Sequence, residues 1–311
     1  MRITRRHLQV SLALLWLLDG ALQCQPYMFS KEFARRILAP AGLGQPSVVA
    51  EPVHVVAVLV SAHPALANGG FATIQIVLGL ALLTRRFPRA ALAASMVWAL
   101  SVWVVGEGLG GVAAGATLLA GAPGSALLYA VIAMLAWPNR DQQEDDRPSW
   151  LALPVWCTLW LTGAVLQLVA GNDSATSLTM MLRAAESGSP GWVAGIDRHL
   201  VRFSLPDWTA AALIAVYVLV AIWALVPGWT RQMSIGIGVF IAMTGWLLFQ
   251  GLGDLTSGQA TDPNSGPLIA LLALAVASAA YSREISTYRV DAVVPSNPEM
   301  RVGIATDFSG S

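Results

Sequence analysis

Long apolar runs separated by short polar stretches dominate the sequence. Eight of these runs approach the roughly 20 residues that a helix needs to cross the hydrocarbon core of a membrane, which is about 30 Å thick. They lie at residues 8–24, 66–83, 90–106, 120–137, 151–170, 207–226, 233–250 and 266–282. Charged residues cluster between the runs. The pattern therefore predicts an all-α, polytopic integral membrane protein with eight transmembrane helices.

Two of the apolar stretches allow other interpretations. The stretch from Pro52 to Pro64 is short and has proline at both ends, so we interpret it as an interfacial or re-entrant segment rather than a ninth span. The first run follows several arginines and resembles a cleaved signal peptide. Asp19 interrupts that run, and the run has a counterpart deep inside the chain. Both features favour a retained first span.

The composition agrees with a lipid environment. Of the 311 residues, 56% are hydrophobic and only 12% are charged, and the mean hydropathy is +0.62. These values are too apolar for an ordinary soluble domain. The net charge is zero and the sequence has no basic stripe, so no nucleic-acid partner is expected. Cys24 and Cys157 lie outside any CxxC or Cys/His motif and indicate neither a disulfide framework nor a zinc site.

Arginines in the short loops predict an orientation. With eight spans, five short arginine-bearing segments fall on one side, which the positive-inside rule assigns to the cytoplasm. These segments lie at residues 2–6, 85–89, 140–147, 231 and 283–289. Lys31 is the only lysine beside many arginines, which suggests a GC-rich and hence bacterial source. We therefore expect a multi-pass protein of the inner (plasma) membrane with both termini in the cytoplasm.

The two halves of the chain share matching positions at a nearly constant offset of 143 or 144 residues. The matches are Trp16 with Trp160, Gln23 with Gln167, and the Gly-Leu-Gly run at 108–110 with the run at 251–253. Matches in the same order over such a distance indicate an internal duplication. Each half contains four of the predicted spans, and an even number makes both halves enter the membrane in the same direction. The prediction is two parallel four-helix repeats.

The repeat also predicts the boundaries of the units. We expect a first four-span unit at residues 1–138, a polar cytoplasmic linker at 139–149, a second unit at 150–283 and a disordered cytoplasmic tail at 284–311.

A long outer loop separates the first two spans of each unit. In the second unit, this loop contains residues with the spacing of an amphipathic helix. Its apolar face would hold Trp192, Ile196, Leu200 and Phe203, and its polar face Asp197, Arg198 and Arg202. Such a helix is expected to lie on the outer membrane surface, so the fold has outer-face amphipathic segments.

The first unit also carries a family pattern. Gly20 lies near the outer end of the first span, the stretch LGLALLTRRFPRAAL occupies residues 78–92, and GSALLYAVIAMLAWP forms the last span at 124–138. This order resembles the DoxX-like family of small four-helix membrane proteins. The resemblance implies a neighbourhood of membrane redox complexes and quinone-linked sulfur oxidation. No lysine follows Gly20 on the first span, where that family often has one, so any role of that lysine is in doubt.

Polar side chains inside predicted spans are candidate functional residues, because an ionised group at the membrane centre costs about 2.5–3.5 kcal/mol on insertion scales. Asp19 and Gln23 lie four residues apart on one face of the first span, and Glu107 lies at the outer end of the third. We hypothesise that these three share an outer-facing proton or cation site. In the second unit, the amides Gln167 and Gln250 match Gln23 and Glu107.

A plainer interpretation stays open for the same residues. The repeated Gly-Leu-Gly run is typical of close helix packing and a sharp exit from the membrane. Glu107 would then be solvated at the surface, and Asp19 would be satisfied by a neighbouring helix. His54 and His63 are weak candidates for a metal site with Glu107 or Asp19, but their spacing matches no recognised motif, and interfacial histidines are the favoured interpretation.

Two functions remain open. The leading hypothesis is a non-catalytic subunit, or a quinone- or lipid-binding module, of a membrane redox system, with the lipid bilayer and redox proteins as partners. The alternative is a proton- or cation-coupled small-molecule transporter with an outer-facing acidic site, although few polar residues lie at mid-membrane. An enzyme acting alone is less expected, because no catalytic trio and no cofactor-binding motif is evident and a quinone is the only cofactor suggested.

Overall fold

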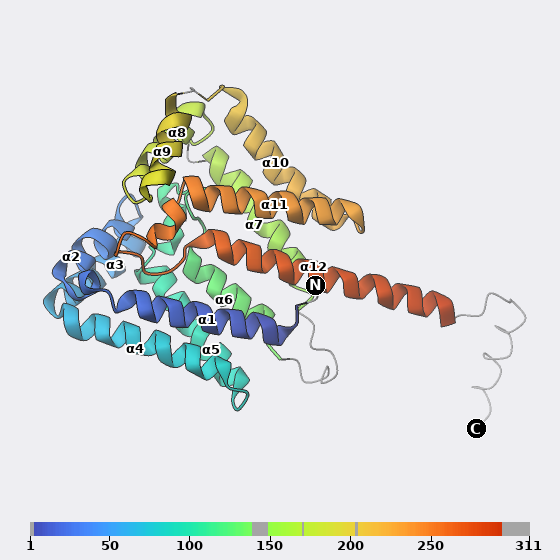
Figure 1. Cartoon of the computed structure of the whole chain (residues 1–311), viewed down its shortest axis with the longest axis horizontal. Helices are drawn as coiled ribbons and strands as arrows, with labels where there is room; N and C mark the ends of the chain where they lie inside the picture. Colours follow the sequence, from blue (N-terminus) through green and yellow to red (C-terminus); the bar gives the residue numbers. More distant parts are fainter. Residues whose placement is uncertain (1–2, 139–148, 170, 203–204, 294–311) are drawn as a thin grey trace, which may run out of the picture.

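The computed structural model is helical and contains no strand over the residues that it describes, which are all except 1–2, 139–148, 170, 203–204 and 294–311. The longer helices of the two halves, together with α6, form a bundle (Figure 1). From the first half these are α1 (Arg5–Gln23), α4 (Pro64–Leu83), α5 (Pro88–Val105) and α6 (Ser125–Leu135), and from the second half α7 (Ala152–Val169), α10 (Trp208–Leu225), α11 (Trp229–Leu248) and α12 (Ser265–Val293). Most of the expected linker and tail lies outside the described residues.

Four of these helices, α4, α5, α10 and α11, are long and apolar enough to cross a membrane. The expected number of eight transmembrane helices is not supported. The clearest reason lies at α6, which has only 11 residues and is therefore about 16 Å long. The apolar run at 120–137 begins instead as an irregular loop, because Gly121 and Gly124 have positive φ angles and the helix starts at Ser125.

Each half pairs its helices in the same order. In the first half α1 packs mainly on α4 and α5 on α6, while in the second half α7 packs mainly on α10 and α11 on α12. One hydrophobic core joins the two halves and includes Trp16 and Tyr129 from the first half and Trp160 and Tyr217 from the second. The bundle therefore has one continuous interior, in which α12 contacts both α6 and α7.

A tryptophan bonded to a serine fixes the first and third helices of each half. The indole Nε1 of Trp16 donates to the Ser95 hydroxyl at 2.8 Å, and the Nε1 of Trp156 donates to the Ser234 hydroxyl at 3.3 Å. All four side chains are buried. A buried indole N–H needs such a partner, so these bonds set the register of α1 on α5 and of α7 on α11.

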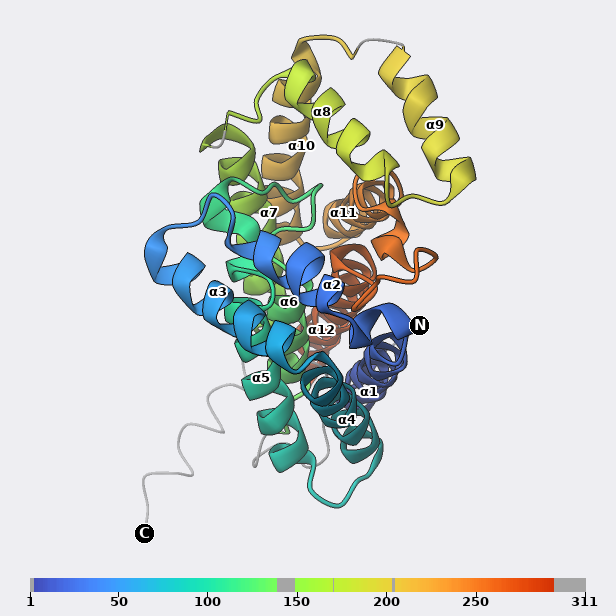
Figure 2. The same cartoon turned by 90° about the vertical axis from the view of Figure 1, so that its left-hand side faces the viewer.

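Short helices cover one end of the bundle, which we call the cap end (Figures 1 and 2). They are α2 (Lys31–Phe33) with η2 (Ala34–Leu38), α3 (Ser47–Ala62), α8 (Ala175–Glu186) and α9 (Gly191–Arg202). The apolar stretch around Pro52 belongs to α3, which continues through this proline. The opposite end holds the start of α1 and the α4–α5 and α10–α11 connections (Figure 1).

The amphipathic helix expected in the outer loop of the second half exists as α9, but its polar face differs from the prediction at Asp197. Trp192 and Ile196 are 60% and 38% exposed, whereas Asp197 is only 1% exposed. Asp197 was expected on the solvent face with Arg198, and that placement is wrong. The reason is tertiary: α9 packs on α8 and α11 and turns Asp197, with Val193 and Ala194, inward. Phe203 lies outside the described residues.

Candidate functional site

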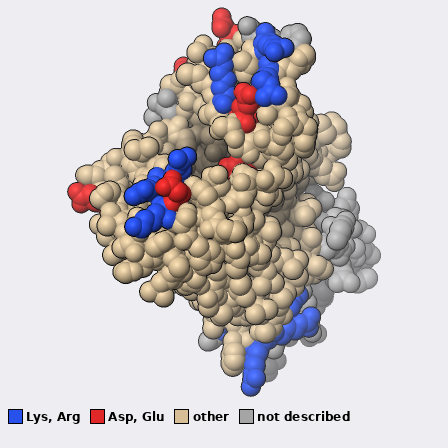
Figure 3. All heavy atoms as spheres, turned by 60° about the vertical axis from the view of Figure 1, so that its left-hand side comes forward, with Lys and Arg blue, Asp and Glu red and all other residues tan. Residues whose placement is uncertain are grey.

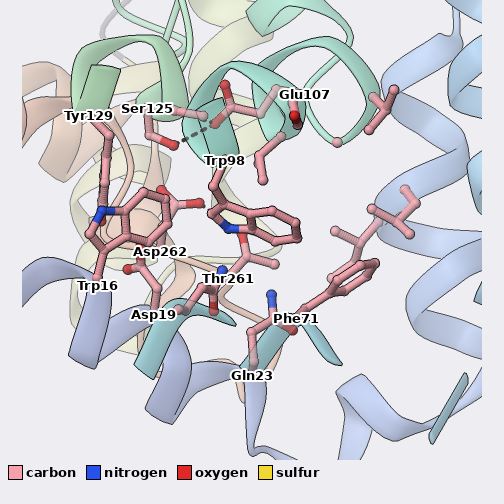
Figure 4. A pocket seen from close by; sticks show the side chains of 18 of the residues that line it. Trp16, Asp19, Gln23, Phe71, Trp98, Glu107, Ser125, Tyr129, Thr261 and Asp262 are labelled. Atoms are coloured by element: carbon pink, nitrogen blue, oxygen red, sulfur yellow. Dashed lines mark hydrogen bonds between the residues drawn. The ribbon is translucent and has the colours of Figure 1, made fainter. Parts of the chain in front are cut away.

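A cavity of about 260 Å³ lies at the cap end of the first half. Its walls come from α1, α4, α5 and α6, from the short α2–α3 region, and from the loop that precedes α12 in the second half. Asp19, Gln23 and Glu107 all line this cavity, so the structure brings the three predicted side chains together (Figure 4). On the outer surface of the cap end, charged side chains gather in two places with a hollow between them (Figure 3).

Aromatic rings form much of the cavity wall. Trp16 and Tyr129 meet edge to face with ring centroids 4.6 Å apart, and Phe71 and Trp98 lie 5.9 Å apart. Figure 4 shows these four rings with the polar side chains around the same space. Such rings offer a large apolar area and negatively polarised faces to a bound molecule.

Asp19 and Gln23 reach the cavity from the last two turns of α1. They are 2% and 4% exposed, and their spacing of four residues puts them on one helix face as expected. Gly20 lets α1 approach α4 closely, because a Cβ atom at this position would lie 2.6 Å from Cγ1 of Ile76. Close packing on α4 thus fixes the end of α1 that carries both polar side chains.

Glu107 lies just beyond the end of α5 and is held by the start of α6. Its Oε1 atom accepts hydrogen bonds from the Ser125 hydroxyl at 2.5 Å and from the Ala126 amide at 3.0 Å. A carboxylate in this position satisfies free N–H groups at a helix N-terminus. Glu107 is therefore anchored by one oxygen, and the plainer expectation that it is merely solvated does not describe this geometry.

The glycine-rich loop after Glu107 is needed for this anchoring. Gly110 has a φ angle of 65°, and a Cβ atom there would lie 1.9 Å from the Pro123 carbonyl oxygen. At Gly124, which has a φ angle of 103°, a Cβ atom would lie 2.2 Å from the Oε2 atom of Glu107. The glycines thus have a structural role, because they let two backbone segments come close together. This close contact positions the Glu107 carboxylate, so the structural role of the glycines is compatible with a functional role of Glu107.

The surroundings of Glu107 make it easier to protonate. Burial, the largest cause, and the negative charge of Asp262 together raise the pKa of this carboxyl group from 4.5 to about 7, although the hydrogen bonds from Ser125 and Ala126 act in the opposite direction. A carboxyl group with such a pKa exchanges a proton near neutral pH.

Sequence reasoning missed Asp262, which brings a third carboxylate to the cavity from the second half. Its Oδ1 atom accepts a hydrogen bond from the Asn264 amide at 2.7 Å, and its Oδ2 atom accepts one from the Thr261 hydroxyl at 2.9 Å. Thr261 also lines the cavity. A weak signal existed, because Asp254 and Asp262 are the only charged residues of their loop, but nothing in the sequence pointed from Asp262 to Asp19.

Several buried polar atoms of the cavity have no hydrogen-bond partner. They are the acceptor oxygens Asp19 Oδ1, Gln23 Oε1, Gln75 Oε1 and Glu107 Oε2 and the Trp98 indole N–H. The Tyr129 hydroxyl makes no well-formed hydrogen bond either, but it interacts with the Asp19 carboxyl group beside it. Among the described residues, no Lys, Arg or His side chain lines the cavity. The site is therefore rich in acceptors and acids, and it matches a molecule that brings hydrogen-bond donors.

The two matching amides of the second half lie outside this cavity. Gln250 donates from Nε2 to the Leu119 carbonyl oxygen at 3.0 Å and accepts through Oε1 from the Ser265 hydroxyl at 3.2 Å. Gln167 is fully buried and donates to the carbonyl oxygen of Asn172. These contacts fit a structural role, and at the position that matches Glu107 the second half has a paired amide instead of an open carboxylate.

The two candidate histidines also lie away from the cavity. His54 is exposed on α3 beside a shallow hollow that includes Glu51, and His63 is exposed at the end of the same helix. Over the described part of the chain, no three His, Cys, Asp or Glu side chains lie close enough together to hold a metal ion.

No protein-family model matches the chain, and neither a curated protein nor a solved structure matches it. The chemistry of the site is therefore argued from its own residues.

Proposed function

We propose that this protein is a membrane-embedded binding module that holds a small lipid-soluble molecule in the cavity at its cap end. The observation that carries the proposal is an aromatic cavity whose polar side contains several buried groups without partners. Each such group costs about 1–3 kcal/mol when left unpaired. A ligand that satisfies several of them while covering the rings would offset these costs.

We further propose that the two halves are parallel four-helix units with the cap end at the outer membrane face. The repeated order of helix pairing supports the duplication. Arg85 and Arg86 lie in the short α4–α5 connection and Arg231 in the first turn of α11, all at the opposite end, and by the positive-inside rule for short connections we assign this end to the cytoplasm. This arrangement corresponds to an inner (plasma) membrane protein with its termini on the cytoplasmic side.

A quinone is the ligand that the resemblance to DoxX-like proteins suggests, in a non-catalytic subunit of a membrane redox system. The four acceptor oxygens favour its reduced form, because a quinol donates two hydroxyl hydrogens, whereas the two carbonyl groups of a quinone accept hydrogen bonds. The Trp98 indole N–H is open to donate to the oxidised form, whereas the Tyr129 hydroxyl interacts with the Asp19 carboxyl group. The proposal thus includes stronger binding of a quinol than of the matching quinone.

A proton- or cation-coupled transporter is the second candidate. One observation favours it: Asp19 and Glu107 belong to the first half and Asp262 to the second, so a movement between the halves would change the acidic site. Uptake into proteoliposomes that depends on a proton gradient would favour this candidate over a static binding module.

Two measurements test the binding function. The protein is extracted in mild detergent, and retained small molecules are identified by native mass spectrometry. Decylubiquinol and decylubiquinone are then titrated into protein in lipid nanodiscs while tryptophan fluorescence is recorded. We expect a retained molecule and saturable quinol binding. Absence of a retained molecule, together with no saturable binding of any probe, would contradict the proposal.

A matched pair of variants localises the binding. Ser101 and Val97 are both exposed on α5 and lie one turn apart, but only Ser101 lines the cavity. We expect Ser101→Trp to weaken quinol binding at least about tenfold by filling the cavity, and Val97→Trp to leave it within about twofold. Equal effects of the two variants would place the binding elsewhere.

A further inference from the structure

We infer that the ligand of this cavity is a positively charged amphiphile, an organic amine or ammonium ion with an apolar body. The inference rests on the proposed function, that the cavity binds a small molecule, and adds the charge of that molecule. It differs from the quinol in a way that binding experiments distinguish.

The charge balance of the cavity carries the first step. Asp19, Glu107 and Asp262 line it and interact with one another as like charges. The described lining residues include no Lys, Arg or His to compensate them. Negative charge in a site of low polarity is costly unless a proton or a cation neutralises it. A cationic ligand would neutralise the carboxylates and pair their open oxygens at the same time.

The size and walls of the cavity favour an organic cation over a metal ion. Over the described residues, no three potential metal ligands converge closely enough to hold one. A bare ion would also leave most of the roughly 260 Å³ unfilled. An ammonium group on an apolar body can reach separated acceptors and fill the remaining space.

The aromatic rings supply the second half of the recognition. Trp16, Trp98 and Phe71 line the same space as the carboxylates (Figure 4). The face of an aromatic ring attracts an ammonium or guanidinium group, and tryptophan does so best. The same rings pack against an apolar body. The aromatic rings and the carboxylates together therefore favour a ligand that has both a positive charge and an apolar body.

Proton exchange is expected to accompany binding. The titratable groups that face Glu107 across the cavity are Asp19 on α1, Tyr129 on α6 and Asp262 in the loop before α12. When a cation binds beside these groups, the ionised form of Glu107 is favoured and its proton leaves for the solvent. Amine binding should therefore strengthen as the pH rises through about 7 and should release protons.

Three probes of similar size test the charge. They are 2-phenylethylamine, 2-phenylethanol and 3-phenylpropionate, which share the ring and differ in the charge of the head group. Binding to the full-length protein in nanodiscs is measured by calorimetry at about pH 8. We expect the amine to bind at least about tenfold more tightly than the alcohol, and the propionate not to bind.

Variants connect this preference to the acids. Asp19→Asn and Glu107→Gln should each weaken binding of the amine at least about tenfold and leave the alcohol within about twofold. Asp254→Asn is the matched control, since Asp254 is an acid of the same outer loop as Asp262 but does not line the cavity. It should leave binding of both probes unchanged.

The outcomes separate this inference from the proposed function. Equal binding of amine and alcohol, or amine binding that survives both acid variants, would overturn the inference and leave the binding module intact. Binding of decylubiquinol without binding of the amine would do the same. If neither the three probes nor the quinol binds, the proposed function itself fails. The comparison of probes on the unmodified protein holds even where a variant does not fold.

Discussion

Glu107 and Gln250 each accept a hydrogen bond from a serine hydroxyl at the start of the following helix, but only Gln250 has both of its polar atoms paired. Ser125 donates to Glu107 Oε1 at 2.5 Å and Ser265 donates to Gln250 Oε1 at 3.2 Å. The remaining atom of Gln250 donates to the Leu119 carbonyl oxygen, whereas Glu107 Oε2 is buried without a partner. The matching side chain is therefore fully hydrogen-bonded in the second half, whereas in the first half one carboxylate oxygen of Glu107 has no partner.

Replacing Glu107 by Gln should remove a pH dependence of stability. The folded protein raises the pKa of Glu107 from 4.5 to about 7, so it binds this proton more tightly than the unfolded chain does. The free energy of unfolding should therefore fall by up to about 3 kcal/mol as the pH rises from about 4.5 to 7, and then level off. Glu107→Gln keeps the Oε1 acceptor for Ser125 and should flatten this part of the profile, measured by thermal unfolding in detergent.

The reciprocal change at Gln250 is the control for that experiment. Gln250→Glu would place a carboxylate oxygen where Nε2 now donates to the Leu119 carbonyl oxygen. Repulsion between the two oxygens should make this variant less stable than the wild type, and more so at about pH 8 than at about pH 5. A pH profile of Glu107→Gln parallel to that of the wild type would contradict the assignment to Glu107.

The buried Trp16–Ser95 bond should matter far more than an exposed serine bond on the same helix. Ser95→Ala leaves the Trp16 indole N–H without a partner in the core, which should cost about 1–3 kcal/mol of unfolding free energy. Ser101 is exposed and donates to the Val97 carbonyl oxygen of its own helix, so Ser101→Ala should change stability by less than about 0.5 kcal/mol in the same thermal unfolding measurement. Similar losses in the two variants would contradict a role of the Trp16 bond in helix register.

The loop that positions Glu107 should not tolerate a side chain at Gly110. A Cβ atom there would lie 1.9 Å from the Pro123 carbonyl oxygen, and the φ angle of 65° is unfavourable for other residues. Gly110→Ala should cost at least about 2 kcal/mol of stability in thermal unfolding. Gly70 lies on α4, and a Cβ atom added there would meet nothing within 4 Å, so Gly70→Ala should instead stabilise by up to about 1 kcal/mol. Loss of stability in both variants would argue against a specific steric role of Gly110.

Asp197 should lower the stability of the cap end at neutral pH. It is 1% exposed and neither of its carboxylate oxygens has a hydrogen-bond partner. Burial, the largest cause, and the charge of Glu186 together raise its pKa from 3.8 to about 6, although the charge of Arg198 acts in the opposite direction. Because the pKa is raised, stability is lost as the pH rises from about 4 through 6.

Replacing Asp197 by Asn removes this charge. Asp197→Asn should raise the unfolding free energy by about 1–2 kcal/mol at about pH 8 and have little effect at about pH 4, as measured by thermal unfolding at both values. Asp207→Asn, at the exposed start of α10, should change stability by less than about 0.5 kcal/mol at either pH. A gain that is equal at the two pH values would show that the charge of Asp197 is not its cause.

Much of the candidate site could be predicted from the sequence, because its main features are local. A spacing of four residues puts Asp19 and Gln23 on one helix face whatever the rest of the chain does. Glu107 follows an apolar run, which places a polar group at the end of a helix. In the structure this group lies at the same end of the bundle as Asp19 and Gln23. The raised pKa of Glu107 could not be predicted, since it depends on burial and on the charge of Asp262.

The apolar runs by themselves determined that the chain is helical and rich in membrane-capable segments, because hydrophobicity and helical periodicity are properties of neighbouring residues. Only the tertiary structure decided that α6 is 11 residues long, that Asp197 turns inward, and that Asp262 joins Asp19 across the two halves. The physical reason is that an apolar side chain is equally stable facing lipid or buried in a protein core, so its sequence does not reveal which it does. Contacts between segments that are distant in the sequence depend on how the helices pack. Packing also decides which carboxylate finds partners and which stays open.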